Sequence, residues 1–178
     1  MYMGKVRRGG YVFVSWAGDQ GRDMKIRRVS ANNRKRVFEV KTSSRVLVLP
    51  YSKVDPRPTQ ADRIAETAVD EELDREGFTY VLESGREGTV HIDQVLEYNQ
   101  DPGYLRDALL YKLTLEAQKR VKSSPLSKRE IIRRLGTSAT QLYRLLDQTN
   151  YRKSVDQILL LLHVLECEVD LVVREKSA

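Results

Sequence analysis

The side chains best suited to chemistry lie close together between residues 138 and 144. Gln141 and Arg144 are three positions apart, and Thr140 and Tyr143 lie beside them. Positions three apart on a helix share one face. Arginine and glutamine can each make two hydrogen bonds to a base edge in the major groove of DNA. This spacing predicts base contacts from Thr140, Gln141, Tyr143 and Arg144.

Cations surround this group in the sequence. Lysine and arginine neutralise phosphates, which hold a protein on a duplex without reading its bases. The residues predicted to contact phosphate are Lys128, Arg129, Ser138, Arg152 and Lys153. The alternative is an ordinary pair of core helices with a solvated basic face, because most charge runs are surface.

Helix start and stop signals place these residues on short helices. Asp101 precedes a proline and a long helical pattern. Ser127, Ser138 and Ser154 each precede a Glu or Gln at the spacing of a capping box. Gly136 lies between the first two boxes, where a helix end in the left-handed conformation favours glycine. Two short helices joined by such a turn are typical of a helix-turn-helix.

Residues from about 113 to 173 resemble the lambda-repressor-like, Cro-type helix-turn-helix family. The similarity is carried by the string LSKREIIRRLGTS at 126–138, by the leucines of the next helix, and by the Leu-rich helix after Ser154. The resemblance implies an all-α domain whose second short helix enters the major groove. It also implies double-stranded DNA as the partner and binding as a homodimer.

Four residues depart from the family pattern: Lys128, Ile132, Ala139 and Asp147. An acidic Asp147 near phosphates would repel DNA, and Ala139 offers no hydrogen bond at the start of the helix. Both favour an alternative function, a protein–protein adaptor or antitoxin module whose helices do not bind DNA. The basic flank favours DNA binding.

Sites for catalysis or metal binding are not indicated. The acidic cluster at residues 70–76 is accompanied by no nucleophile or base, so an enzyme is the least favoured of the functional hypotheses. His91 and His163 lack metal-ligand spacing, and Cys167 is the single cysteine. We therefore expect no enzyme activity, no metal and no cofactor.

Charge is unevenly distributed along the 178 residues. Residues 1–45 contain 12 Lys or Arg against 3 Asp or Glu, residues 46–103 contain 5 against 13, and residues 104–178 contain 14 against 9. Basic segments attract polyanions. The longest apolar run is five residues, so no membrane span is expected. The single cysteine and the lack of a signal-peptide pattern predict a cytoplasmic protein.

The N-terminal part is predicted to be rich in strands. Segments 11–16, 24–30, 36–41 and 45–49 have apolar or alternating patterns separated by turn residues, which indicates a meander. Segments 78–83 and 89–93 predict a hairpin, 93–98 a short helix, and 59–69 either a strand or a helix.

Residues 24 to about 98 resemble a small bacterial domain family of unknown function. The resemblance rests on the short strands, on residues 70–73 and on the string GTVHID at 88–93 with Val95 and Leu96. It implies a regulatory role or a protein partner for this domain, not a reaction.

The predicted fold class is α+β, with an N-terminal β-rich small domain (1–98) followed by an all-α lambda-repressor-like helix-turn-helix domain (101–178). The predicted function is sequence-specific DNA binding as a transcriptional regulator, in an autoregulatory or antitoxin-like setting.

Overall fold

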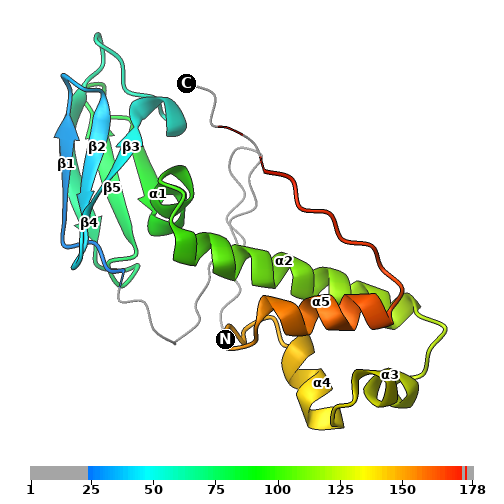
Figure 1. The fold of residues 1–178 in the computed structure, drawn as a ribbon. Helices are drawn as coiled ribbons and strands as arrows, with labels where there is room; N and C mark the ends of the chain where they lie inside the picture. Colours follow the sequence, from blue (N-terminus) through cyan, green and yellow to red (C-terminus); the bar gives the residue numbers. More distant parts are fainter. Residues whose placement is uncertain (1–23, 174, 176–178) are drawn as a thin grey trace.

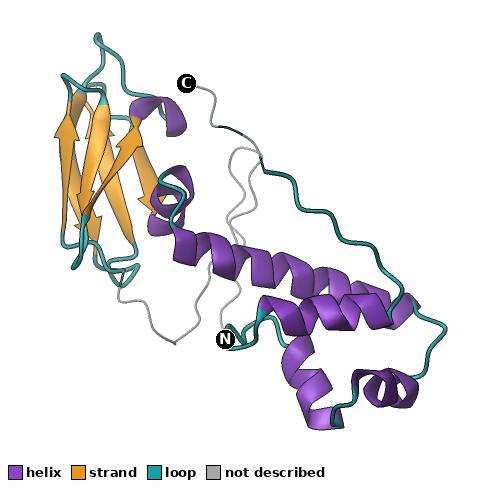
Figure 2. Cartoon of the chain, in the orientation of Figure 1, coloured by secondary structure: helices purple, strands orange, loops and turns teal. Residues whose placement is uncertain are grey.

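The computed structural model describes residues 24–173 and 175, so the strand expected at 11–16 lies outside the described part of the chain. Strands come first along these residues and helices follow (Figures 1 and 2). The strands are β1 (Arg28–Asn32), β2 (Val37–Lys41), β3 (Val46–Pro50), β4 (Ile64–Asp70), β5 (Gly77–Leu82) and β6 (Glu87–His91). The helices are the short η1 (Tyr51–Lys53), α1 (Ile92–Tyr98), α2 (Pro102–Ser123), α3 (Lys128–Leu135), α4 (Ala139–Leu146) and α5 (Val155–Val164).

The described strands form two antiparallel sheets of three strands each, in the orders β1-β2-β3 and β4-β5-β6. The predicted meander and the predicted β5–β6 hairpin are confirmed, and the ambiguous segment 59–69 contains β4. The two sheets meet where β1 lies beside β4, and the hydroxyl of Thr67 donates to the carbonyl of Val29 at 3.5 Å.

Aromatic side chains fill the space between the two sheets. Phe38 lies at the centre, and its ring centroid is 4.9 Å from that of Tyr51, 5.0 Å from Phe78 and 5.1 Å from Tyr80. Each of these three rings is tilted against Phe38, and all four are buried. Tilted aromatic pairs contribute about 0.5–1.5 kcal/mol each beyond their buried area. This cluster therefore holds the two sheets together.

Gly88 on β6 makes room for one of these rings. A Cβ atom at this position would lie 2.4 Å from the hydroxyl oxygen of Tyr80 and 2.5 Å from its Cζ. The ring cannot move aside, because Tyr80 is fully buried and its hydroxyl donates to the carbonyl of Pro56 at 2.7 Å. The absence of a side chain at 88 is thus a packing requirement of β5 and β6.

The junction between the sheets and the long helix α2 is tied by polar contacts. Asp101 begins α2 by accepting a hydrogen bond from the backbone N–H of Tyr104 at 2.8 Å, as the predicted N-cap. Its carboxylate is buried and pairs with Arg45, which follows β2 in the chain. Asn99 donates from its side chain to the carbonyl of Val48 on β3 at 2.8 Å. The start of α2 is therefore anchored to the first sheet.

Helices α2 to α5 share a second apolar core. Its buried members are Ala117, Ile131, Leu142, Leu145, Ile158, Leu161 and Leu162. Helix α2 contacts both α4 and α5, and α3 contacts α5. None of the described helices has the length and apolar character that crossing a membrane requires.

The predicted fold class is wrong in its second half. The described chain is an α+β arrangement of two three-stranded sheets followed by helices, without an evident all-α helix-turn-helix domain. The 22-residue α2 begins at the sheet region and ends in the helical core, so this helix is shared by both parts of the described chain (Figure 1). After α5, residues 166–173 form no helix.

We expect Gly88→Ala to destabilise the protein by about 1–3 kcal/mol, the usual cost of adding a methyl group to a packed core. Urea unfolding followed by circular dichroism measures this loss. The double variant Tyr80→Leu/Gly88→Ala is the control: if the clash is with the ring, the two substitutions are strongly non-additive. A single Gly88→Ala variant as stable as the parent chain would contradict this packing argument.

Candidate nucleic-acid interface

Helix α3 begins and ends as its sequence predicts. The side chain of Ser127 accepts from the backbone N–H of Glu130 at 3.2 Å. At the other end Gly136 has φ +60°, its N–H donates to the carbonyl of Arg133, and the N–H of Thr137 donates to that of Ile132. This pair of bonds is a Schellman motif, which needs a left-handed residue. The turn to α4 is therefore set by backbone geometry.

Glu130 does not complete the predicted capping box. Its carboxylate accepts hydrogen bonds from Arg133 at 2.6 and 2.8 Å and from Arg134 at 2.9 Å. The hydrogen bonds from these guanidinium groups lower the pKa of Glu130 to about 2. Two of the cations that flank the candidate site are thus partly neutralised within α3.

Helix α4 turns an apolar side inward and a polar side outward. Ser138 is its N-cap and accepts from the backbone N–H of Gln141 at 3.2 Å. Leu142 and Leu145 are buried in the helical core. Thr140, Gln141, Tyr143 and Arg144 are all exposed. The structure brings together the four residues predicted to contact bases, because they occupy the one side of α4 that does not pack.

The C-terminal end of α4 is held by side-chain donors from other segments. The side chain of Asn150 donates to the carbonyl of Arg144, and that of Gln118 on α2 donates to the carbonyl of Leu146 at 2.7 Å. The ammonium of Lys153 donates to the carbonyls of Leu145 and Asp147. Carbonyls at a helix end have no partner within the helix, so these donors satisfy them.

Lys153 is therefore removed from the predicted phosphate contacts. Lys153 is only 6% exposed, and burial lowers the pKa of its ammonium to about 8. An ammonium that is buried and bonded to two carbonyls cannot reach a phosphate outside. Arg152 is exposed, but it lies in the same loop beyond the C-terminal end of α4, away from Ser138. The interface is thus smaller than the sequence predicted.

Asp147 does not pair with Arg144, although they are three positions apart. Its carboxylate accepts from the backbone N–H of Thr149 at 2.9 Å and from the Thr149 hydroxyl at 2.7 Å. These bonds lower the pKa of Asp147. Within the described residues no acidic group bonds to the guanidinium of Arg144. The Arg144 side chain is available to an external ligand.

Lys128 joins α3 to the exposed side of α4. Its Nζ lies 5.4 Å from the ring centroid of Tyr143, which is within cation–π range. Tyr143 itself is 57% exposed. Arg129 is the next residue and is also exposed. We call Lys128, Arg129, Ser138 and the four exposed residues of α4 the α3–α4 face; α3 and α4 lie at the lower right of Figure 1.

Sequence reasoning missed the roles of Gln118 and Lys153 as caps for α4. The spacing of Ser154 and Gln157 was informative, because this capping box is complete in the structure. No local pattern marks Gln118, which lies 28 positions from the carbonyl that it caps. Contacts over such separations depend on how α2 and α4 pack.

We expect the stability that Lys153 contributes to rise with pH between about 8 and 10. The pKa of Lys153 is lower in the folded chain than in the unfolded chain, so in this window the unfolded chain binds more protons than the folded chain. The free energy of unfolding therefore increases as the pH rises. Urea unfolding of the parent chain and Lys153→Met at pH 7.5, 8.5 and 9.5 measures the difference. Lys112→Met, which removes an exposed ammonium, is the control. A difference that stays constant or falls with pH would refute the inward placement of Lys153.

Comparison with known proteins assigns no family to the chain. No protein-family model matches the chain, and neither the curated proteins nor the solved structures compared with it include a significant match. The family resemblances of the sequence stay predictions, and the α3–α4 face has to be interpreted from its own chemistry.

Proposed function

We propose that this protein binds double-stranded DNA sequence-specifically through the α3–α4 face and acts as a transcriptional regulator. The observation that carries the proposal is the exposed guanidinium of Arg144, which no acidic side chain of the described residues pairs with, beside Gln141 and Thr140 on the exposed side of α4. A helix fits the major groove, and its arginine and glutamine side chains can reach base edges there. A cytoplasmic location and an autoregulatory or antitoxin-like setting belong to the same proposal.

The residues of the face divide into two roles. Arg144 and Gln141 read bases, and Thr140 and Tyr143 assist them. Lys128, Arg129 and Ser138 hold phosphates, since they lie at the starts of α3 and α4. The Nζ of Lys128 also lies 5.4 Å from the centroid of the Tyr143 ring. Neutral and basic groups line this face, while Glu130 and Asp147 are occupied by their own hydrogen bonds.

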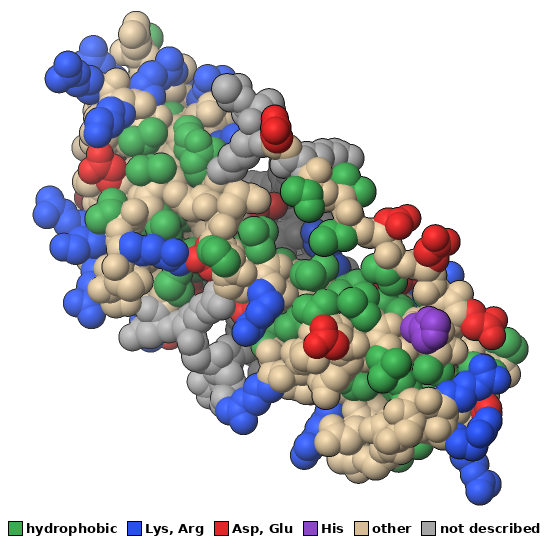
Figure 3. Space-filling view, viewed as in Figure 1, with side chains coloured by type: hydrophobic (Ala, Val, Ile, Leu, Met, Phe, Trp, Pro, Cys, Tyr) green, Lys and Arg blue, Asp and Glu red, His purple; other side chains and the backbone are tan. Residues whose placement is uncertain are grey.

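The proposal includes a homodimer, which would suit a two-fold operator. Leu159 and Leu160 on α5 are exposed, and after α5 the side chains of Leu171, Val172 and Val173 are 81%, 69% and 85% exposed. Exposed apolar patches mark interaction surfaces. The helical part of Figure 3 shows hydrophobic side chains gathered over this side of the molecule. A second copy of the chain is the partner that this proposal assigns to them.

An adaptor that binds protein but no DNA is the competing function. The same exposed apolar residues favour it, because they would serve a foreign partner equally well. A gel shift on bulk duplex DNA at low salt distinguishes the two functions. Retention of the duplex that weakens steeply as salt rises supports DNA binding. No retention at low salt supports the adaptor.

Arg144→Ala and Lys128→Ala should behave differently on a selected binding site and a scrambled duplex. Loss of Arg144 should weaken specific binding by about 1–3 kcal/mol, roughly 5- to 150-fold, and relax specificity at one base pair. Loss of Lys128 should weaken both duplexes alike and reduce the salt slope by about one. Fluorescence anisotropy measures both effects. An unchanged ratio of specific to scrambled affinity in Arg144→Ala would remove the base-reading role.

Leu160→Glu should convert a dimer into a monomer in sedimentation at tens of micromolar protein. A charge buried at an apolar interface costs several kcal/mol unless it is paired. Val46→Glu is the matched control, because Val46 is an exposed apolar residue on the first sheet instead of on α5. The prediction fails if the parent chain is monomeric, or if Val46→Glu is the variant that dissociates it.

A further inference from the structure

A second group of cations lies on the sheet region, far from the α3–α4 face. The fold brings the turn between β1 and β2 to the same end of the sheets as η1 and the loop that follows it (Figure 1, upper left). The exposed cations of these segments are Arg34, Lys35, Arg36, Lys53 and Arg57, which we call the sheet-end patch. Lysine and arginine side chains gather at this end in Figure 3.

Backbone and aromatic contacts hold the first two segments of the patch together. The N–H of Tyr51 donates to the carbonyl of Arg36 at 3.0 Å, and the Tyr51 hydroxyl donates to the side chain of Asn33 at 3.1 Å. The ring of Tyr51 is buried against Phe38. The side chain of Asn32 accepts from the N–H of Lys35, which closes the turn. The backbone that carries these cations is therefore held in place by hydrogen bonds and aromatic packing.

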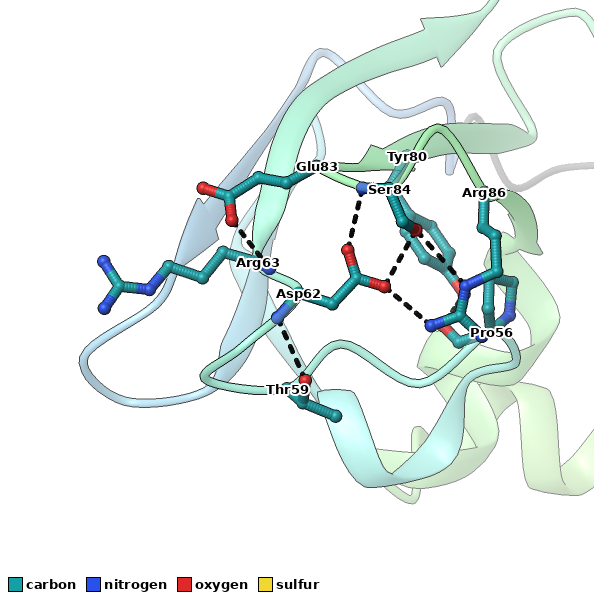
Figure 4. Close-up of polar contacts among 8 residues, drawn as sticks. All are labelled: Pro56, Thr59, Asp62, Arg63, Tyr80, Glu83, Ser84 and Arg86. Carbon is teal, nitrogen blue, oxygen red and sulfur yellow. Dashed lines mark hydrogen bonds and ion pairs between the residues drawn. The ribbon is translucent and has the colours of Figure 1, made fainter.

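The loop that carries Arg57 is fastened by a separate cluster, which Figure 4 shows. The carboxylate of Asp62 accepts from the backbone N–H and the hydroxyl of Ser84, each at 2.9 Å, and from Arg86 at 2.6 Å. On the other side of Arg57 the carbonyl of Pro56 accepts from Tyr80. Hydrogen bonds thus join the loop to the β5–β6 turn through Asp62 and to the core through Pro56. Arg57 lies between these two residues in the chain.

The composition of the patch fits a phosphate backbone better than a protein surface. None of its five cations pairs with an acidic side chain among the described residues, and the exposed Asp55 is the one carboxylate within residues 33–36 and 51–58. Exposed large apolar side chains are also lacking at residues 33–36 and 51–58. Protein interfaces use apolar and aromatic anchors at their centres, whereas protein–DNA interfaces are polar and positively charged.

The two basic surfaces lie at opposite ends of the described molecule. Helix α2 connects them, and its 22 residues span about 33 Å at 1.5 Å per residue. Helices α3 and α4 lie at the opposite end of the ribbon from the β1–β2 turn and η1 (Figure 1). We propose that the sheet-end patch binds the phosphate backbone of a second DNA duplex, so that the protein bridges two segments. The bridging role rests on the proposed function of the α3–α4 face.

The first test isolates the patch from the α3–α4 face. In an Arg144→Ala/Lys128→Ala background, anisotropy at low salt measures the residual binding of a labelled random duplex. Adding Arg34→Gln, Lys35→Gln and Lys53→Gln should weaken this residual binding at least tenfold and reduce its salt slope by about three, one for each lost phosphate contact. The control adds Arg27→Gln, Arg28→Gln and Lys41→Gln, the same charge change at the other ends of β1 and β2.

Absence of residual binding, or equal losses in the patch and control variants, would overturn the patch as a DNA site. This test does not need the α3–α4 face, so its failure is distinguishable from failure of the proposed function. The latter is measured by the effect of Arg144→Ala on specific binding in the otherwise unchanged chain. Circular dichroism melts of both triple variants show that loss of binding is not loss of folding.

The second test measures bridging. The full chain is bound to a bead-linked specific duplex, and capture of a fluorescent second duplex is recorded. The parent chain and the control variant should capture it, and the patch variant should lose most of the signal. Equal capture by the patch variant would assign bridging to a dimer of α3–α4 faces and overturn the proposal. Patch-dependent capture of labelled polyglutamate or duplex RNA in preference to DNA would also overturn it.

Discussion

Helix α4 ends at Leu146 without a left-handed residue, so its last carbonyl groups need hydrogen-bond donors from elsewhere. Lys153, Gln118 and Asn150 supply them from the α4–α5 loop and from α2. These donors bind α4 at one end, while the Schellman turn at Gly136 sets its approach at the other. The exposed side of α4, and with it every residue proposed to read bases, is positioned by this pair of constraints.

The buried ammonium of Lys153 is a costly way to end a helix, because desolvation opposes its charge. It is tolerated because it supplies a donor to the carbonyl of Leu145 at the end of α4, and an unpaired buried polar group also costs free energy. The consequence for function is a smaller cationic surface than the sequence suggests. Its cations are concentrated at the start of α3, where Lys128 lies over the ring of Tyr143.

The sheet region and the helices are connected through the start of α2. The buried carboxylate of Asp101 both begins the helix and pairs with Arg45, so the ion pair and the helix cap depend on the same side chain. The chain has a basic surface at each end, and the acidic run at residues 70–76 belongs to the β4–β5 turn between them in the sequence. Two basic surfaces separated by a helix are the physical basis for the bridging proposal.

Local chemistry determined much of the secondary structure. The strand patterns, the N-caps at Asp101, Ser127, Ser138 and Ser154, and the helix end at Gly136 depend on neighbours within a few residues, and they could be predicted. The exposed polar side of α4 could be predicted for the same reason, because the positions of Leu142 and Leu145 indicate which side packs.

Only the tertiary structure decided how these elements combine. The expectation of a separate all-α domain failed because α2 serves both the sheet region and the helical core, which no local pattern reveals. Glu130 left its capping box because two arginines one turn away compete for its carboxylate. Lys153 turned inward because α4 needed donors at its end. In the sheet-end patch, hydrogen bonds of Tyr51 join residues 34–36 to the segment of Lys53, and the bonds of Pro56 and Asp62 hold the loop of Arg57. Spacing in the sequence does not encode these contacts.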